Sequence, residues 1–339
     1  MKLSKTKILI LKEKKFFFYL FFSSIFFLSF ILIMNILIDP LWYFKGNQIQ
    51  KKNLVFNERF TKINLFLRDK KNSKYDCYIF GTSVSTTINQ NSFKKNKCFN
   101  FSFSAGNINE YLNYLNYLKN KNFYPEVIYI EIPTFFDISE KKKYEELREN
   151  FKNIYLVGYF PPIATDQLYK QLIIEKKKIN SNNDVANVPD FIIDLRNPKS
   201  YFVEYLSLNS FIFTIKSFFN LSNYTNAYDQ NFVGYVRKDK INFINKKFDN
   251  KNFKKDQLKK IILNRIEALN YFNNVYDFSV PSHEVNDLNN TYDGSHYYAD
   301  FISQIAYSIE YNIDEFGLEV NTLNYENNYL SKYKIYLKN

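Results

Sequence analysis

The chain has 339 residues, and 46 Lys and Arg against 34 Asp and Glu give it a formal net charge of +12. Hydrophobic residues make up 46% and aromatic residues 19%, so a chain that is disordered throughout is excluded, because this much apolar surface must be buried. Seven glycines exclude a collagen-like chain, two cysteines exclude a disulfide framework, and two histidines limit any histidine base or multi-histidine metal site to His283 and His296.

Residues 16–38 form an uncharged stretch rich in Phe, Leu and Ile. As a helix it would reach about 34 Å, enough to cross a bilayer core of about 30 Å. A cleaved signal peptide is the alternative, but its apolar region usually has about 7–15 residues and ends in a small-residue cleavage site. This stretch instead runs into Asp39, Pro40 and the aromatic residues Trp42 and Tyr43, which suit a membrane interface. We therefore expect an uncleaved transmembrane helix.

Lysines on the two sides of this helix predict its orientation. The leader, residues 1–15, has six lysines and one glutamate, and fewer lysines follow the span, which favours a cytoplasmic N-terminus. The remaining chain keeps +7 (12 − 5), a surplus that suits anionic headgroups or acidic polymers but follows equally from a Lys-, Asn- and Ile-rich composition. No segment resembles a nucleic-acid module, so nucleic acid is not an expected partner. In an oxidising compartment Cys77 and Cys98 could pair, although two buried reduced thiols fit the sequence as well.

After a charged connector (39–74), the chain shows short apolar runs separated by polar turns. Residues 75–80 predict a buried strand that stops at Gly81, residues 98–103 a second strand and residues 126–132 a third. Apolar residues at helical spacing predict a helix over 110–121. Strand, turn, strand, helix and strand in this order indicate a three-layer α/β domain with a mainly parallel sheet, which we place at 75–315.

The second half is less regular. We expect a helical insertion over about 140–250, with a charged helix at 141–152 and a loop at 180–187. Residues 201–221 are strongly apolar, but Glu204 and Lys216 argue against a second span and favour lipid-surface contact or a core helix. A helix at 254–272, a strand at 275–278, a loop at 290–296 and a helix at 298–311 follow, and 316–339 is expected to be a tail. We find no convincing fourth strand between 230 and 270, which suggests a trimmed sheet.

Two segments carry residues suited to nucleophilic chemistry. Ser83 follows the first predicted strand, at the sheet edge where open α/β folds bind ligands. Asp293 precedes His296 by three residues in a turn with Gly294, so its carboxylate can orient the imidazole. Ser83 would attack a carbonyl, and His296 would accept and return its proton. His283 is the rival base.

In order, these landmarks resemble those of SGNH/GDSL-type hydrolases, and more narrowly the membrane-anchored SGNH-like proteins found with bacterial cell-surface polysaccharide genes. The matching segments are 38–44 (IDPLWYF), 80–83 (FGTS), 100–106 (NFSFSAG), 127–132 (VIYIEI), 276–278 (YDF) and 292–297 (YDGSHY). The resemblance implies an SGNH-hydrolase-like (flavodoxin-like) parallel sheet outside the bacterial cytoplasmic membrane, Ser83 as nucleophile and Asp293 and His296 as its partners. It also implies that Gly106, with the Ser83 N–H, contributes to an oxyanion hole.

The same resemblance implies a serine esterase or O-acyltransferase acting on the acyl groups of a surface polysaccharide, without a cofactor. One departure concerns the family's G-x-N-D block, which is absent after the third strand, where the chain reads Glu131, Ile132 and Pro133. Asn107, adjacent to Gly106, could supply the missing oxyanion donor. A catalytically degenerate scaffold in polysaccharide assembly or export is therefore the alternative. No Gly-rich phosphate loop occurs and neither cysteine has metal-ligand spacing, so no metal site is expected.

Overall fold

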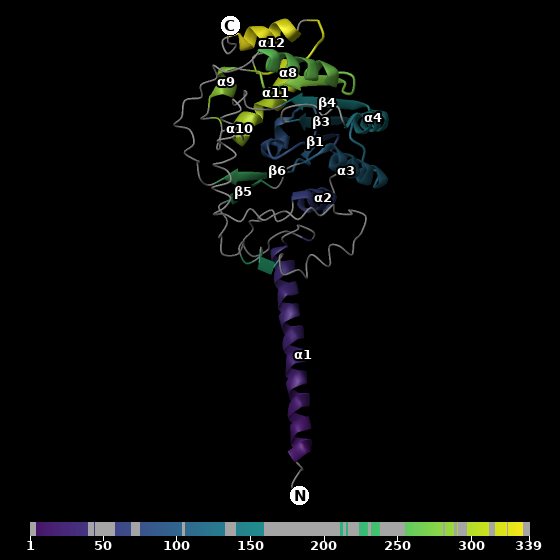
Figure 1. The fold of residues 1–339 in the computed structure, drawn as a ribbon, viewed down its shortest axis with the longest axis vertical. Coiled ribbons are helices and arrows are strands. Elements are labelled where there is room, and N and C mark those ends of the chain that lie inside the picture. The colour runs from purple at the N-terminus through teal and green to yellow at the C-terminus, as the bar shows by residue number, and fades with distance from the viewer. Residues whose placement is uncertain are drawn as a thin grey trace. The chain divides into compact units, whose positions relative to one another are not determined.

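In the computed structural model the chain has two units, one formed by Met1–Asn57 and Ile192–Ser222 and the other by Glu58–Phe191 and Asn223–Asn339. Figure 1 shows the helices and strands of the chain as ribbons and arrows. The structure describes residues 5–39, 44, 58–68, 75–103, 106–132, 140–158, 211–212, 215, 224–229, 232–237, 255–280, 282–287, 290, 297–311, 316–323 and 325–334.

The first unit contains the long apolar helix α1 (Lys5–Ile38). Its segment Glu13–Ile38 has 26 residues, about 39 Å of helix, which is enough to cross a bilayer core. The side chains from Phe16 to Phe22 are 51–68% exposed, and so large an apolar surface is unfavourable in water. The hydroxyls of Ser23 and Ser24 donate to the Leu20 carbonyl, so neither polar group faces the surroundings unsatisfied. The expected long apolar helix is confirmed, as a membrane anchor or a signal sequence.

Asp39 ends α1 by adopting the left-handed region, with φ 48°. Its N–H donates to the Asn35 carbonyl (2.8 Å), and its Oδ2 accepts from the Phe44 N–H (2.9 Å). Aspartate tolerates this conformation because its short side chain can bond the nearby backbone. Asp39, noted in the sequence after the apolar stretch, is therefore the end of the helix.

A six-stranded sheet forms the centre of the second unit. Its order is β2-β1-β3-β4-β7-β8, the first five strands being parallel and β8 antiparallel to β7. The strands are β1 (Cys77–Phe80), β2 (Cys98–Asn100), β3 (Val127–Ile132), β4 (Asn153–Gly158), β7 (Asn274–Asp277) and β8 (Leu318–Glu319). A separate antiparallel hairpin consists of β5 (Tyr224–Asp229) and β6 (Phe232–Arg237), with β6 beside the short helix η2 (Ser85–Thr87). The predicted α/β class with a mainly parallel sheet is confirmed.

One face of the sheet is covered by an aromatic layer. Tyr78 and Phe80 of β1 point to this face and contact Phe101, while Phe66 of α2 (Glu58–Arg68) packs on Tyr78 and Phe101. Tyr111 of α3 (Ile108–Asn120) completes the layer against Phe80. Helix α4 (Lys141–Asn150) packs beside α3, and α8 (Lys255–Ala268) packs against β7. Phe66, Phe80 and Phe101 are fully buried in this layer.

The opposite face carries the alternate residues of the same strands, as the two-residue period of a strand requires. Cys77 and Ile79 of β1 and Tyr129 of β3 belong to one buried cluster with Ile302 and Ile305. Those last two residues lie on α10 (Ala299–Ile302) and α11 (Gln304–Tyr311), and the short helices η2 and η3 (Gln90–Ser92) lie on the same side. Helices on both faces of the sheet give the expected three layers.

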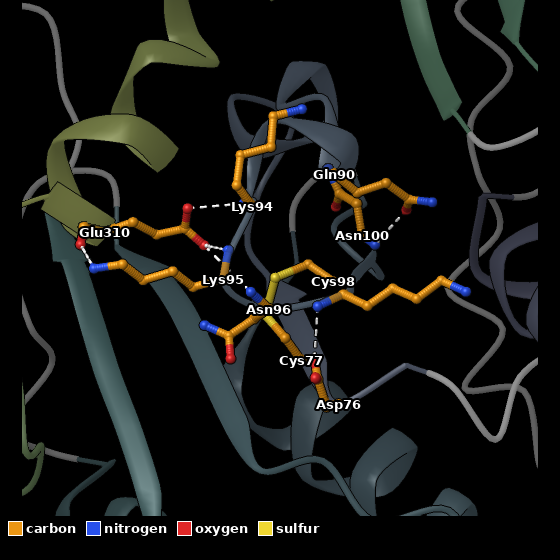
Figure 2. The surroundings of a disulfide bond; sticks show 10 residues. Asp76, Cys77, Gln90, Lys94, Lys95, Asn96, Cys98, Asn100 and Glu310 are labelled. Carbon is orange, nitrogen blue, oxygen red and sulfur yellow. Dashed lines mark hydrogen bonds between the residues drawn. A yellow bond between two sulfur atoms is a disulfide. The ribbon is translucent and has the colours of Figure 1, made fainter.

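A disulfide joins Cys77 to Cys98, which are register partners on β1 and β2 (Figure 2). The loop before β2 is held at both ends by carboxylates. Glu310 of α11 accepts from the backbone N–H groups of Lys94 (2.7 Å) and Lys95 (2.9 Å), and Asp76 accepts from the Lys97 N–H (2.7 Å). Of the two possibilities left open by the sequence, the structure has the bonded one.

The structure differs from the sequence expectation at two places. The range expected to be a helical insertion contains β4, which pairs with both β3 and β7 inside the sheet. It also contains the hairpin β5–β6, so a strand does occur between 230 and 270, although it lies outside the six-stranded sheet. Asn153 begins β4 directly after α4, and its segment NIYLVG has the continuous apolar character of a strand buried on both faces. This strand is not predicted from the sequence, because the residues after the charged helix are assigned there to the helical insertion.

The second difference is the C-terminal segment, which was expected to be a tail. It contains β8 and α12 (Tyr325–Tyr333), and α12 packs on α8. Tyr325 and Tyr329 are 2% and 0% exposed. The Tyr325 hydroxyl donates to Asp277 at the end of β7 (2.8 Å), and Asp277 also pairs with Arg265 of α8 at 3.2 Å. Most of the apolar segment 201–221 lies outside the described residues; residues 211, 212 and 215 are helical.

Candidate functional site

The carboxyl ends of β1 and β3 form the point where the sheet changes winding direction. The chain leaves β1 toward β2 on one side and then returns past β1 to β3, which gives the order 2-1-3-4-5 for the parallel strands. Connections on the two sides of such a point diverge and leave a crevice, which is where doubly wound sheets bind ligands. Three segments meet at this edge: residues 81–87 after β1, the described residues 101–103 and 106–107 after β2, and the end of β3.

Ser83 lies in the turn that follows β1. The Ser85 N–H donates to the Thr82 carbonyl (3.1 Å), and the Thr86 hydroxyl donates to the Ser83 carbonyl (2.6 Å), so the chain folds back at once into η2. Ser83 is partly exposed, whereas Val84 and Ser85 are buried. The sequence expectation that Ser83 follows the first strand at its carboxyl end is confirmed.

Glu131, the fifth residue of β3, places a buried carboxylate beneath this turn. It is 3% exposed, and its Oε2 accepts from the Thr82 N–H (2.6 Å), the Thr82 hydroxyl (2.9 Å) and the Ser85 hydroxyl (3.1 Å). The sequence predicts no role for Glu131, which appears there only where the chain departs from the G-x-N-D block. The single charge inside the apolar strand VIYIEI could have indicated such a role. A carboxylate is buried within a strand only where hydrogen-bond donors satisfy it.

Gly106 lets the loop after β2 approach the turn after β1 closely. A Cβ on Gly106 would lie 2.8 Å from the Gly81 carbonyl oxygen and 2.6 Å from the Tyr111 hydroxyl. The Gly81 carbonyl accepts from the Phe103 N–H, and the Gly106 N–H donates to the Phe103 carbonyl, each at 3.1 Å. Gly106 therefore borders the Ser83 turn, as expected, but in this structure its N–H is engaged within its own loop.

Asn107 has a structural task. Its Oδ1 accepts from the N–H groups of Asn109 (3.1 Å) and Glu110 (3.2 Å), which caps α3, and its Nδ2 donates to the Glu110 carboxylate (2.9 Å). Glu110 also pairs with Arg59 of α2 at 2.6 Å, and the Arg59 guanidinium lies 4.4 Å from the centre of the Phe103 ring. The amide expected to replace a missing oxyanion donor is thus used in holding the loop to α2 and α3.

Two buried groups near this edge have perturbed pKa values. Burial, and next the Glu131 carboxylate, raise the pKa of Tyr111 well above its ordinary value, so its phenol stays protonated. Burial lowers the pKa of Lys62 on α2 to about 8, an effect that Glu58 opposes. The Lys62 ammonium donates to the Asn100 carbonyl at the end of β2 (2.9 Å), so it stabilises the strand from which the second loop departs.

The predicted partners of Ser83, Asp293 and His296, lie outside the described residues. Tyr297 follows His296 directly, is fully buried, and donates to the Val285 carbonyl (2.8 Å). Tyr297 belongs to the same buried cluster as Val84, the residue after Ser83. The rival base His283 begins the short helix α9 (His283–Asn286), and its side chain lies outside the described atoms.

Within the part of the chain that the structure describes, no group of three or more His, Cys, Asp or Glu side chains could hold a metal ion. Comparisons with protein families, with characterised proteins and with solved structures found no match to this chain.

Proposed function

We propose that the protein is a membrane-anchored, SGNH-like serine esterase or O-acyltransferase that acts on acyl groups of an envelope or extracellular polysaccharide. The observation that carries the proposal is the position of Ser83 at the switch point of the sheet, in the turn that begins with Gly81, whose carbonyl Gly106 approaches closely. The shared buried cluster of Val84 and Tyr297 supports His296 as its partner, because these residues directly follow Ser83 and His296 in the chain. The polysaccharide substrate rests on the sequence resemblance.

In the proposed reaction the Ser83 hydroxyl attacks the acyl carbonyl carbon while His296 accepts its proton. The carbon–oxygen bond to the sugar then breaks, and His296 returns the proton to the leaving sugar oxygen. Asp293 orients the imidazole and stabilises its protonated form. Water or a second sugar hydroxyl, deprotonated by His296, attacks the acyl-Ser83 carbonyl carbon. The bond from this carbon to the Ser83 oxygen then breaks, His296 returns the proton to that oxygen, and the acid or the new sugar ester leaves.

The proposed location is the outer side of the cytoplasmic membrane, with the N-terminus inside. The lysine-rich leader before α1 supports this orientation. The Cys77–Cys98 disulfide supports it independently, because such bonds persist in oxidising compartments and are rare in the cytoplasm. A reporter that is active only outside the cytoplasm should be active when fused to the C-terminus. A stable but inactive fusion would contradict the proposed orientation.

The catalytic proposal is tested with the full chain in detergent micelles and p-nitrophenyl acetate as substrate. We expect Ser83→Ala and His296→Ala to abolish turnover, and His283→Ala to retain it. Ser92→Ala, at a partly exposed serine of η3, is the matched control and should also retain it. Equal background rates in the wild type and all variants would contradict the enzyme proposal for simple esters, and loss with His283→Ala alone would contradict the assignment of the base.

A catalytically degenerate scaffold in polysaccharide assembly or export is the second candidate, and one set of observations favours it. The Gly106 N–H and the Asn107 amide, two of the expected oxyanion donors, are engaged in hydrogen bonds within the fold. Loss of one oxyanion donor typically lowers kcat about 10²–10³-fold. A wild-type rate equal to that of Ser83→Ala would support the scaffold.

A further inference from the structure

We propose that Glu131 is a positioning residue for Ser83, and that its carboxylate holds the turn after β1 in place at the switch point. This inference rests on the proposed function, because it concerns how the candidate nucleophile is presented. The carboxylate contacts residues on both sides of Ser83: Thr82 precedes it and Ser85 follows two positions later. Ser83 is therefore held within a clamp whose fixed end is a sheet strand.

The sheet register brings Glu131 to this position. Phe80 of β1 pairs with Ile130 of β3, so the next residues along the two parallel strands, Gly81 and Glu131, are neighbours. A Cβ on Gly81 would lie 2.7 Å from the Glu131 Oε2 and 2.6 Å from the Ser85 Oγ. Only glycine leaves space there for the carboxylate to reach under the turn and accept from both hydroxyl-bearing residues.

The hydrogen bonds explain why a charge is tolerated at a site that is 3% exposed. An unpaired carboxylate is very unfavourable in such surroundings, and hydrogen bonds to the ionised form offset that cost. Three donors converge on a single oxygen, two of them from Thr82, so the backbone and side chain of the residue before Ser83 are both fixed. A neutral apolar residue could fill the space but would leave these donors without their acceptor.

The clamp can be tested without substrate by placing a thiol at the position of Ser83. The chain has two cysteines, and they are joined in the buried disulfide, so Ser83→Cys introduces a single free thiol. Iodoacetamide alkylates its thiolate with release of iodide. The rate as a function of pH gives the pKa of the thiol, and the limiting rate above that pKa reports how the side chain is held and exposed.

Adding Glu131→Gln to Ser83→Cys removes the negative charge while keeping the side-chain shape. We expect the pKa of the introduced thiol to fall by about 1 unit, as for a charge a few ångströms away in partly buried surroundings, and the limiting rate to rise several-fold as the turn loosens. Glu126→Gln is the matched control, because Glu126 is an exposed residue just before the opposite end of β3. It should change neither quantity.

The double change Thr82→Val and Ser85→Ala removes both hydroxyl donors but retains the carboxylate. In the Ser83→Cys background the double change should raise the limiting rate of alkylation without lowering the pKa of the thiol. It also tests the clamp if the Glu131→Gln protein does not fold. Unchanged rates and pKa in a folded Glu131→Gln protein, or an unchanged limiting rate in the double variant, would overturn the clamp.

The same measurements separate the clamp from the proposed function. If the wild type shows no ester turnover but the thiol pKa and the alkylation rate change as expected, the clamp stands and the enzyme proposal is contradicted. Turnover that depends on Ser83, combined with no shifts, would retain the enzyme and remove the clamp.

Discussion

Removal of the Cys77–Cys98 disulfide is expected to lower the free energy of unfolding of the α/β unit by about 3 kcal/mol through the lost cross-link. The bond joins residues 21 positions apart in sequence and closes the loop that contains the Ser83 turn, η2 and η3. In the chain-entropy relation, the unfolded chain gains the freedom of a loop of this length when the bond is absent. Both cysteines are buried, so replacement by alanine adds about 1 kcal/mol of lost packing at each site.

The assay is urea unfolding of the full chain in detergent micelles, followed by pulse proteolysis. We compare the wild type with Cys77→Ala, Cys98→Ala and the double variant. Each single variant already lacks the cross-link, so all three should lose about 3–5 kcal/mol and differ from one another by only about 1 kcal/mol. For a domain of this size the midpoint of thermal unfolding should fall by about 10 °C.

Ser92→Ala, inside the loop that the bond closes, is the control and should unfold like the wild type. Variants that all stay within about 1 kcal/mol of the wild type would refute the reasoning, because the cross-link would then not be restricting the unfolded chain. A large loss in the double variant alone would point instead to packing of the two sulfur atoms.

Three further predictions use other buried groups. The pKa of Lys62 is about 8 in the folded state, against an ordinary value of 10.5, so between these pH values the unfolded chain binds the proton that the folded chain has lost. The free energy of unfolding should therefore rise by up to about 3 kcal/mol from about pH 8 to 10.5. Urea midpoints measured at about pH 7.5 and 10 should show this rise in the wild type and not in Lys62→Met. Gly106→Ala should lower the free energy of unfolding by about 1–3 kcal/mol, because the added methyl group would clash with the Gly81 carbonyl oxygen. A urea midpoint equal to that of the wild type would contradict this close approach. Arg265→Met should lower the free energy of unfolding by about 3–5 kcal/mol, because it leaves Asp277 without its buried cation. The double variant Arg265→Met/Asp277→Leu should lose less stability than the sum of the losses in the two single variants. Strict additivity would mean that the two side chains do not interact.

Much of the fold was predictable from local patterns. The charge-free stretch predicted α1, and short apolar runs predicted β1 and β3, because these features depend on residues close in sequence. Strand β4 was missed although its pattern is of the same kind, since it follows a highly charged helix and was grouped with it. Helix α12 was missed because its burial depends on Tyr325 meeting Asp277, 48 residues away, and its own sequence is largely polar.

The candidate site divides in the same way. Ser83 could be named from its position after the first strand, because the carboxyl end of a strand is a local property, whereas Gly106 was named only through the family resemblance. The use of Asn107 as a helix cap was also readable in principle, since a polar residue with Glu110 three positions later is a common helix start. Glu131 could not be assigned a partner, because its contact with Thr82 spans 49 residues and needs the order and register of the sheet.

The amino-acid sequence alone is sufficient to specify an apolar helix long enough for a membrane, a mainly parallel α/β domain and a serine after its first strand. Each of these follows from composition or periodicity over a few neighbouring residues. The pairing of Cys77 with Cys98, the engagement of the Gly106 N–H and the carboxylate of Glu131 beneath the Ser83 turn come from tertiary structure. They depend on which strands are adjacent and in what register, and that choice is made by the packing of both sheet faces at once.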